Sequence, residues 1–155
     1  MRRFIIALAF LSNVGLALGA EDPAPARGPD PAVLAFTLPA DFKWKESTEF
    51  LGLSSVVLYG DPSKPGLYAV RNRFSPGSFS RPHFHPNDRF IVVVSGTWWV
   101  GTGPLFDPKS TTPMPVGSFV THYADKIHYD GAKAEACEVV IFGMGPTTTT
   151  RVGDK

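Results

Sequence analysis

The stretch that decides the fold is GSFSRPHFHPNDRFIVVVSG, residues 77–96. Two histidines, His83 and His85, stand two positions apart in it, and an apolar run, 90–94, follows them. Residues two apart on a β-strand face the same side, so both imidazoles would project into one space. A metal ion needs this arrangement from two of its ligands. Taken alone, a His-x-His pair between two prolines fits a pair of surface histidines equally well.

The glycines that flank the histidine pair favour the metal-site interpretation. Gly77 lies six residues before His83, and Gly96 lies eleven after His85, with a strand-like run filling most of the second gap. This spacing resembles the first motif of the cupin superfamily, in which a glycine, a His-x-His pair, an acidic residue and a second glycine follow one another. The family's acidic ligand falls at position 89, which is Arg89 in this chain.

The second cupin motif is matched by Gly117 and His128, which are eleven residues apart with a turn between them. Where the family usually has Asp, Pro and Gly, this chain has Ser118, Tyr123 and Asp125. Asp tolerates left-handed backbone better than most residues, so we expect the turn to form. The resemblance implies an all-β fold with little helix, a cupin-type jelly-roll β-barrel that commonly forms a homodimer.

The resemblance also implies a metal site made of His83, His85 and His128. The expected cofactor is one divalent transition metal ion, and a three-histidine set accepts iron, manganese, nickel, copper or zinc. Arg89 then allows two interpretations. At the rim of a neutral three-histidine site it would bind a substrate carboxylate through paired hydrogen bonds. Aimed at the centre, it would repel the metal and leave a barrel that holds an anion; we adopt the first interpretation.

A fourth histidine, His122, lies six residues before His128 at the end of a strand-like segment. It is a candidate fourth ligand or general base, because an imidazole titrates near neutral pH. The alternative is a histidine that is hydrogen-bonded to the adjoining loop. His122 and Arg89 are therefore the candidate catalytic residues. Asp88 is one position out of register with the family's acidic ligand and is expected to face the other way.

The remainder of the chain alternates strand-like segments with turn-forming residues, which favours a sandwich or closed barrel. The expected strands cover residues 51–59, 67–74, 90–100, 116–122, 127–129 and 137–142. One helical turn is expected within 33–45, and a long loop over 101–115. Trp98 and Trp99 should face opposite sides of their strand, and Cys137 should be a buried structural thiol.

The first twenty residues have the order of a secretory signal peptide: two arginines, an apolar run over 4–18, and small residues before a polar segment. An uncleaved membrane anchor is the alternative, which polar interruptions of the run disfavour. The mature protein is expected to be periplasmic or secreted, with no membrane attachment after cleavage. The predicted parts of the chain are a signal peptide (1–20), a Pro-rich linker (21–31), one barrel domain (32–146) and a flexible tail (147–155).

The charge balance excludes several classes of partner. The formal net charge is +1, and loss of Arg2 and Arg3 would leave 13 basic against 14 acidic residues. Neither value favours nucleic acid or an anionic membrane surface, so the expected partner is a small molecule. The predicted function is a metal-dependent enzyme of dioxygenase, isomerase or lyase type that acts on a small anionic or polar organic molecule. The alternative is a non-catalytic periplasmic cupin that binds or senses a metal or a small ligand.

Overall fold

The structure is a computed structural model that describes residues 28–153. Two units are distinguished by their internal contacts, one ending at Phe36 and one beginning at Thr37. In the first unit a turn begins at Asp30, whose backbone carbonyl accepts hydrogen bonds from two later amides. The predicted signal peptide and most of the predicted linker lie outside the described residues, so cleavage and export stay predictions. In the described part of the chain, no helix has the length and apolar character needed to cross a membrane.

Short strands dominate the second unit, as the alternation of apolar segments and turns predicts. One helical turn is expected within 33–45, and a 3-10 helix, η1 (Pro39–Asp41), lies there. A second 3-10 helix is η2 (Pro108–Ser110). The strands are β1 (Lys45–Glu46), β2 (Leu53–Tyr59), β3 (Gly66–Phe74), β4 (His83–Phe84), β5 (Arg89–Ser95), β6 (Trp98–Thr102), β7 (Thr112–Met114), β8 (Phe119–His122), β9 (His128–Gly131), β10 (Cys137–Gly145) and β11 (Thr150–Arg151).

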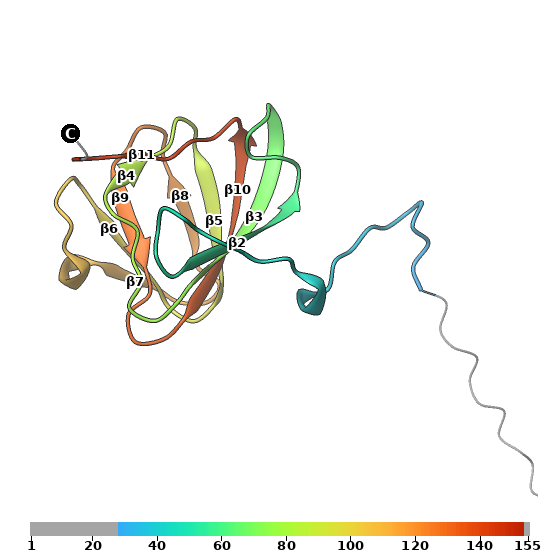
Figure 1. Cartoon of the computed structure of the whole chain (residues 1–155), viewed down its shortest axis with the longest axis horizontal. Helices are drawn as coiled ribbons and strands as arrows, with labels where there is room; N and C mark the ends of the chain where they lie inside the picture. Colours follow the sequence, from blue (N-terminus) through green and yellow to red (C-terminus); the bar gives the residue numbers. More distant parts are fainter. Residues whose placement is uncertain (1–27, 154–155) are drawn as a thin grey trace, which may run out of the picture. The chain divides into compact units, whose positions relative to one another are not determined.

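These strands form two antiparallel sheets, which lie opposite one another in Figure 1. One has the order β1-β2-β3-β10-β5-β8, and the other has the order β11-β4-β9-β6-β7. Neighbours in a sheet are often far apart in sequence: β10 lies between β3 and β5. This interleaving of early and late strands is typical of a jelly roll. The predicted all-β class is confirmed.

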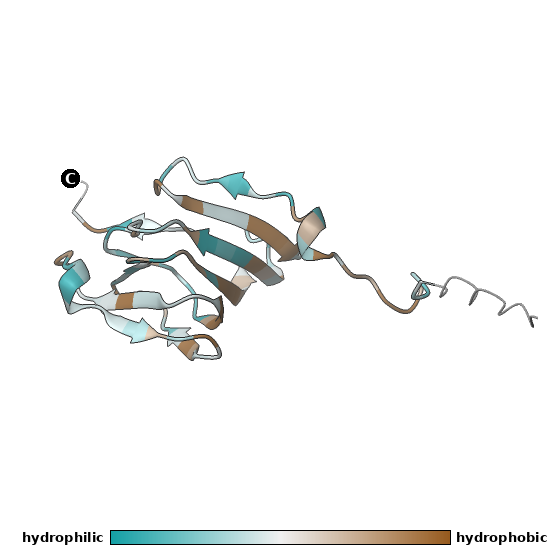
Figure 2. Ribbon diagram, turned by 90° about the horizontal axis from the view of Figure 1, so that it is seen from below, coloured by the Kyte–Doolittle hydropathy of each residue, from teal (hydrophilic) through white to brown (hydrophobic). Residues whose placement is uncertain are grey.

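The core lies between the two sheets because apolar residues alternate along the strands. In β5, Ile91 and Val93 are fully buried while Phe90 is 41% exposed, and β10 repeats the pattern. Figure 2 shows brown, apolar stretches between paler and teal ones on strands of both sheets. The core cluster contains Phe74, Ile91, Val93, Trp98, Val100, Ala132, Cys137, Val139 and Ile141. Burial of these side chains stabilises the barrel. Each of the larger ones contributes about 1.5–3 kcal/mol.

Three side chains behave as the alternation predicts. Trp98 is fully buried, whereas Trp99 faces outward with the Lys133 ammonium 3.7 Å from its ring centroid. Cys137 is buried, and its burial raises the pKa of the thiol to about 12. It is therefore a thiol at any physiological pH and packs as a small apolar residue.

The segment expected as one strand over 90–100 is divided by Gly96. This residue has a φ of +64°, and a Cβ atom there would stand 2.2 Å from the Ala136 carbonyl oxygen. Glycine is required on both counts. The turn sends β5 into the six-stranded sheet and β6 into the five-stranded sheet.

The long loop predicted over 101–115 is wrong in part. β6 continues to Thr102, and β7 pairs with it through Thr112, Pro113 and Met114. Proline cannot donate a ladder hydrogen bond, so a proline-rich segment argues against a strand in general. β7 is the edge strand of its sheet, however, and an edge strand has one side on which no donor is needed.

Within the segment predicted as a flexible tail, 147–155, the structure has one more strand. β11 pairs with β4, so that Thr150 lies opposite Phe84 and Arg151 lies opposite His83. The four threonines that precede Arg151 are β-branched, which suits an extended edge strand. The barrel therefore continues past residue 146, and this last strand lies next to the histidine pair.

Candidate metal centre

Three of the four histidines form one buried cluster. His83 belongs to β4, His85 follows that strand directly, and His128 opens β9, where it is paired with His83. One nitrogen of each ring lies within 4.8 Å of those of the other two. The ring centroids are 4.4 to 5.3 Å apart, and the three residues are 3–4% exposed. The geometry therefore brings together the three histidines that the sequence singles out as metal ligands.

Each of these rings is held by one backbone carbonyl. The Nδ1 atom of His83 donates to the Arg81 oxygen at 2.7 Å. That of His85 donates to Thr148 at 2.8 Å, and that of His128 donates to Lys126 at 2.9 Å. A carbonyl only accepts, so the proton of a neutral ring is on Nδ1 and Nε2 carries the lone pair. The Nε2 atoms of His85 and His128 are buried and have no hydrogen-bond partner among the described residues.

Burial also keeps these imidazoles neutral. Burial is the largest influence on the pKa of each ring. It lowers the pKa of His83, and it lowers the pKa of His85 to about 2 and that of His128 to about 4. Metal binding requires the neutral ring, with one nitrogen free of its proton. A carbonyl on Nδ1 that fixes both ring orientation and tautomer is the usual support of a metal-bound histidine. The cluster is thus suited to hold a metal ion.

Arg89 points into the barrel. It is the first residue of β5 and lines an internal cavity of about 60 Å³ together with His83 and His85. Its Nε atom is buried and has no partner in the described part of the chain. Burial lowers the pKa of the guanidinium, while Tyr68 and Asp130 raise it. A cation thus lies beside the three neutral rings, at the position where the family has a carboxylate.

Asp130, which the sequence analysis does not single out, supplies a carboxylate from another strand. It lies two residues after His128 on β9, is 5% exposed and lines the same cavity. One carboxylate oxygen accepts a hydrogen bond from the Ser80 hydroxyl. The same hydroxyl accepts a hydrogen bond from the Asp130 backbone amide at 2.9 Å. Its charge raises the pKa of both His83 and His128 against the effect of burial. The signal in the sequence was the two-residue spacing of His128 and Asp130.

His122 lies beside this cluster without being part of it. Its ring centroid is 3.8 Å from that of His128 and 5.5 Å from that of Trp98. Both of its nitrogens are buried and lack partners among the described residues, so the alternative of a hydrogen bond to the adjoining loop is wrong. Burial lowers its pKa, which makes the ring neutral. Asp88 is outside the site, as expected, and accepts the Ala124 amide at 2.7 Å.

The two departures in the second motif are accommodated by the backbone. Asp125 takes the left-handed conformation, with a φ of 59°, at the position where the family has glycine. Its amide donates to the His85 carbonyl at 2.8 Å, so the turn after β8 is attached to the histidine pair. The expected turn therefore forms.

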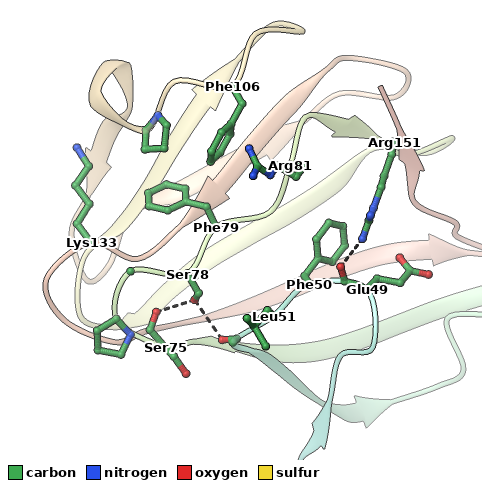
Figure 3. A pocket seen from close by; sticks show the side chains of 14 residues that line it. Glu49, Phe50, Leu51, Ser75, Ser78, Phe79, Arg81, Phe106, Lys133 and Arg151 are labelled. Atoms are coloured by element: carbon green, nitrogen blue, oxygen red, sulfur yellow. Dashed lines mark hydrogen bonds between the residues drawn. The ribbon is translucent and has the colours of Figure 1, made fainter. Parts of the chain in front are cut away.

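The internal cavity is covered on one side by Phe50 and Thr149. The Phe50 ring lies 5.6 Å from the His83 ring and also lines an outer cleft of about 800 Å³ (Figure 3). Arg151 of β11 holds this cover in place. Its guanidinium lies 4.8 Å from the Phe50 ring centroid and donates to the Glu49 carbonyl.

Comparisons with known proteins show the fold. No family model and no curated protein matches the sequence. Among solved structures, the polyketide cyclase RemF from Streptomyces resistomycificus has a TM-score of 0.67 at 15% identity, over 79% of this chain and 87% of that one. A cupin 2 conserved barrel domain protein from Rhodopseudomonas palustris has 0.58 at 14% identity, over 76% and 83%. The DMSP lyase DddQ from Ruegeria pomeroyi has 0.58 at 15%, over 72% and 61%. The fold of this chain is therefore that of the cupins.

Proposed function

We propose that this chain is a metal-dependent cupin enzyme that acts on a small anionic organic molecule. The observation that carries the proposal is the set of three buried, neutral imidazoles whose Nδ1 atoms all donate to backbone carbonyls. His83, His85 and His128 would hold one divalent transition metal ion through Nε2. When bound, such an ion supplies Lewis acidity toward a substrate oxygen, or activates water or dioxygen.

The chain's own residues divide the remaining work. Arg89 offers guanidinium N–H groups to an anionic group of the substrate in the internal cavity, where little water competes. Asp130 and His122 are a carboxylate and a neutral imidazole on opposite sides of His128 in the chain, and both are buried. They are the groups through which a proton would be taken up or released. This pair favours the enzyme over the non-catalytic binding protein, because binding alone needs no group that transfers a proton.

The similarity to solved structures supports a small-molecule substrate. Two of those structures are named as enzymes, a polyketide cyclase and a DMSP lyase. Their identities to this chain are too low to transfer a reaction. The reaction of this chain therefore follows from its own cavity, in which Arg89 replaces the carboxylate ligand.

The proposal is tested by the metal content of the full chain, produced without a histidine tag. We expect His83→Ala, His85→Ala and His128→Ala each to remove most of the bound metal, as measured by elemental analysis, because two remaining ligands do not complete a site. His122→Ala is the matched control, since it removes another buried histidine, whose ring lies next to that of His128. It should retain the metal.

Circular dichroism separates loss of ligand from loss of fold. Any of the three variants that keeps its metal with an unchanged spectrum removes that histidine from the site, and retention by all three contradicts the proposal. Loss of metal from folded His122→Ala would instead add a fourth ligand.

A further inference from the structure

The outer cleft in Figure 3 has the size of a ligand site. Its volume of about 800 Å³ is within the range of about 300–1,000 Å³ that small-molecule sites occupy. The internal cavity, at about 60 Å³, has room for a few water molecules or one small group. Phe50 lines both spaces. The outer cleft and the internal cavity are therefore neighbours that meet at Phe50.

The cleft is lined by cations and by phenyl rings. Arg81 lies with its guanidinium carbon 4.3 Å from the Phe106 ring centroid, and Phe106 packs edge-on against Phe79 at 6.2 Å. Stacking holds a guanidinium flat while its edge N–H groups stay available to an anion. Lys133 and Arg151 line the same cleft, and Glu49 is its one acidic residue. Within residues 28–153, neither Arg81 nor Lys133 forms an ion pair with a carboxylate.

The cleft offers few neutral side chains that could bind the hydroxyl groups of a sugar. Phenyl rings and Leu51 offer no hydrogen-bond partner for hydroxyl groups. The Ser78 hydroxyl is already used, since it donates to the Ser75 carbonyl at 2.7 Å and lies 3.2 Å from that of Gly52 (Figure 3). The chemistry that matches apolar rings beside fixed guanidinium groups is a flat apolar body that carries a negative charge.

We infer that the outer cleft binds a planar aromatic carboxylate, with the ring against Phe79 and Phe106 and the carboxylate on Arg81. As an assignment of the substrate class the inference rests on the proposed function, but binding in the cleft requires no metal. Arg81 binds this carboxylate in the outer cleft, and the internal Arg89 is left for a second anionic group of the substrate. The two arginines lie on different sides of the Phe50 cover.

Calorimetric titration of the full chain with 2-naphthoate tests the inference. Two matched probes accompany it: decahydro-2-naphthoate, which keeps the charge and loses the flat ring, and 2-naphthalenemethanol, which keeps the ring and loses the charge. We expect 2-naphthoate to bind and each of the others to bind at least about tenfold more weakly, because each lacks one of the two interactions.

Arg81→Gln should weaken 2-naphthoate binding by about tenfold or more. Arg73→Gln is the matched control, because that guanidinium also lies over an aromatic ring, at 4.1 Å from the Trp44 centroid, but outside the cleft. It should bind as the unaltered chain does. The inference is overturned if 2-naphthoate does not bind, if the three probes bind equally, or if Arg81→Gln binds as tightly as Arg73→Gln.

Failure of this inference is distinguishable from failure of the metal proposal. Folded His128→Ala should lose metal and keep 2-naphthoate binding, whereas Arg81→Gln should keep metal and lose 2-naphthoate binding. If 2-naphthoate binding disappears with the metal in His128→Ala, the probe binds the ion and not the cleft, and the inference is overturned. If 2-naphthoate binds as expected to a chain that takes up no metal, the cleft assignment stands and the metal proposal fails.

Discussion

Arg89 and Asp130 bring opposite charges to the site from two different strands. The cation stands at the start of β5, and the carboxylate comes from β9, two residues after His128. Both line the internal cavity, and the negative charge of Asp130 raises the pKa of Arg89. A buried cation that is balanced by a nearby carboxylate costs much less than an isolated one. The internal cavity can therefore hold a guanidinium beside three neutral imidazoles.

Arg89→Met tests the anion-binding role of this residue. The substitution removes the charge and keeps most of the side-chain stem, so metal content should stay near that of the unaltered chain. Binding of acetate, measured by calorimetry, should weaken by about 1.5–3 kcal/mol, the worth of a charge-assisted hydrogen bond. Arg71→Met is the control, because Arg71 pairs with Glu138 on the outer face of the sheet, with a distance of 2.6 Å. Acetate binding that is equal in the two variants would contradict the role.

The residues of the site divide into those that the sequence could indicate and those that it could not. The spacing of His83, His85 and His128 matches a known motif, so their convergence could be predicted from sequence. Thr148, whose carbonyl accepts a hydrogen bond from His85 Nδ1, is 63 residues further along the chain. Its contribution is a backbone carbonyl, which any residue type supplies, so no side-chain pattern marks it.

At the scale of elements, Arg89 reaches the inside of the barrel on a strand that is separate from that of the histidine pair. An inward direction would follow from the histidine pair itself only if one strand ran unbroken from His83 through Pro86. The chain instead leaves β4 after Phe84 and starts β5 in the opposite sheet. Arg89 points inward because Ile91 and Val93 follow it at two-residue spacing and face the core. Alternation within β5 could be read from the sequence, whereas the change of sheet depends on contacts between distant strands.

Gly131→Ala tests how β9 is positioned. A Cβ atom at Gly131 would stand 2.2 Å from the Ser78 carbonyl oxygen and 2.6 Å from the Phe79 ring. Because a carbonyl of the backbone cannot turn aside as a side chain does, β9 must shift. We expect the free energy of unfolding in urea to fall by about 1–3 kcal/mol. We also expect weaker metal binding, since His128 and Asp130 are on the same strand.

Gly28→Ala is the control for this change, because a Cβ atom there meets nothing within 4 Å. It should unfold at the same urea concentration as the unaltered chain. A Gly131→Ala variant that is equally stable would show that the close approach of β9 to residues 78 and 79 is not required.

For the whole molecule, four buried histidines link stability to pH. Their pKa values in the folded chain are below the ordinary 6.5, about 4 for His128 and about 2 for His85. The unfolded chain therefore binds more protons than the folded chain below pH 6.5. Stability is fully present above that pH and is lost as the pH falls. The slope is up to about 1.4 kcal/mol per pH unit for each histidine that stays neutral.

Urea unfolding of the metal-free chain at pH 7, 6 and 5 measures this slope. We expect the free energy of unfolding to fall steadily across the series, and His122→Asn to reduce the slope by the share of one histidine. The same stability at pH 7 and pH 5 would mean that the four rings are accessible to protons in the folded chain.

The segment that closes over the histidines has a consequence for the order of events in biosynthesis. His85 is oriented by the Thr148 carbonyl, and the Phe50 cover is tied down by Arg151, which is 102 residues from its partner Glu49. During translation the three histidines leave the ribosome before residues 148–151 exist outside it. A nascent chain thus carries the ligands without the groups that aim and enclose them. The proposed ion would therefore be enclosed only after residues 148–151 have left the ribosome and folded, so the metals that surround the chain at that stage decide which ion it holds.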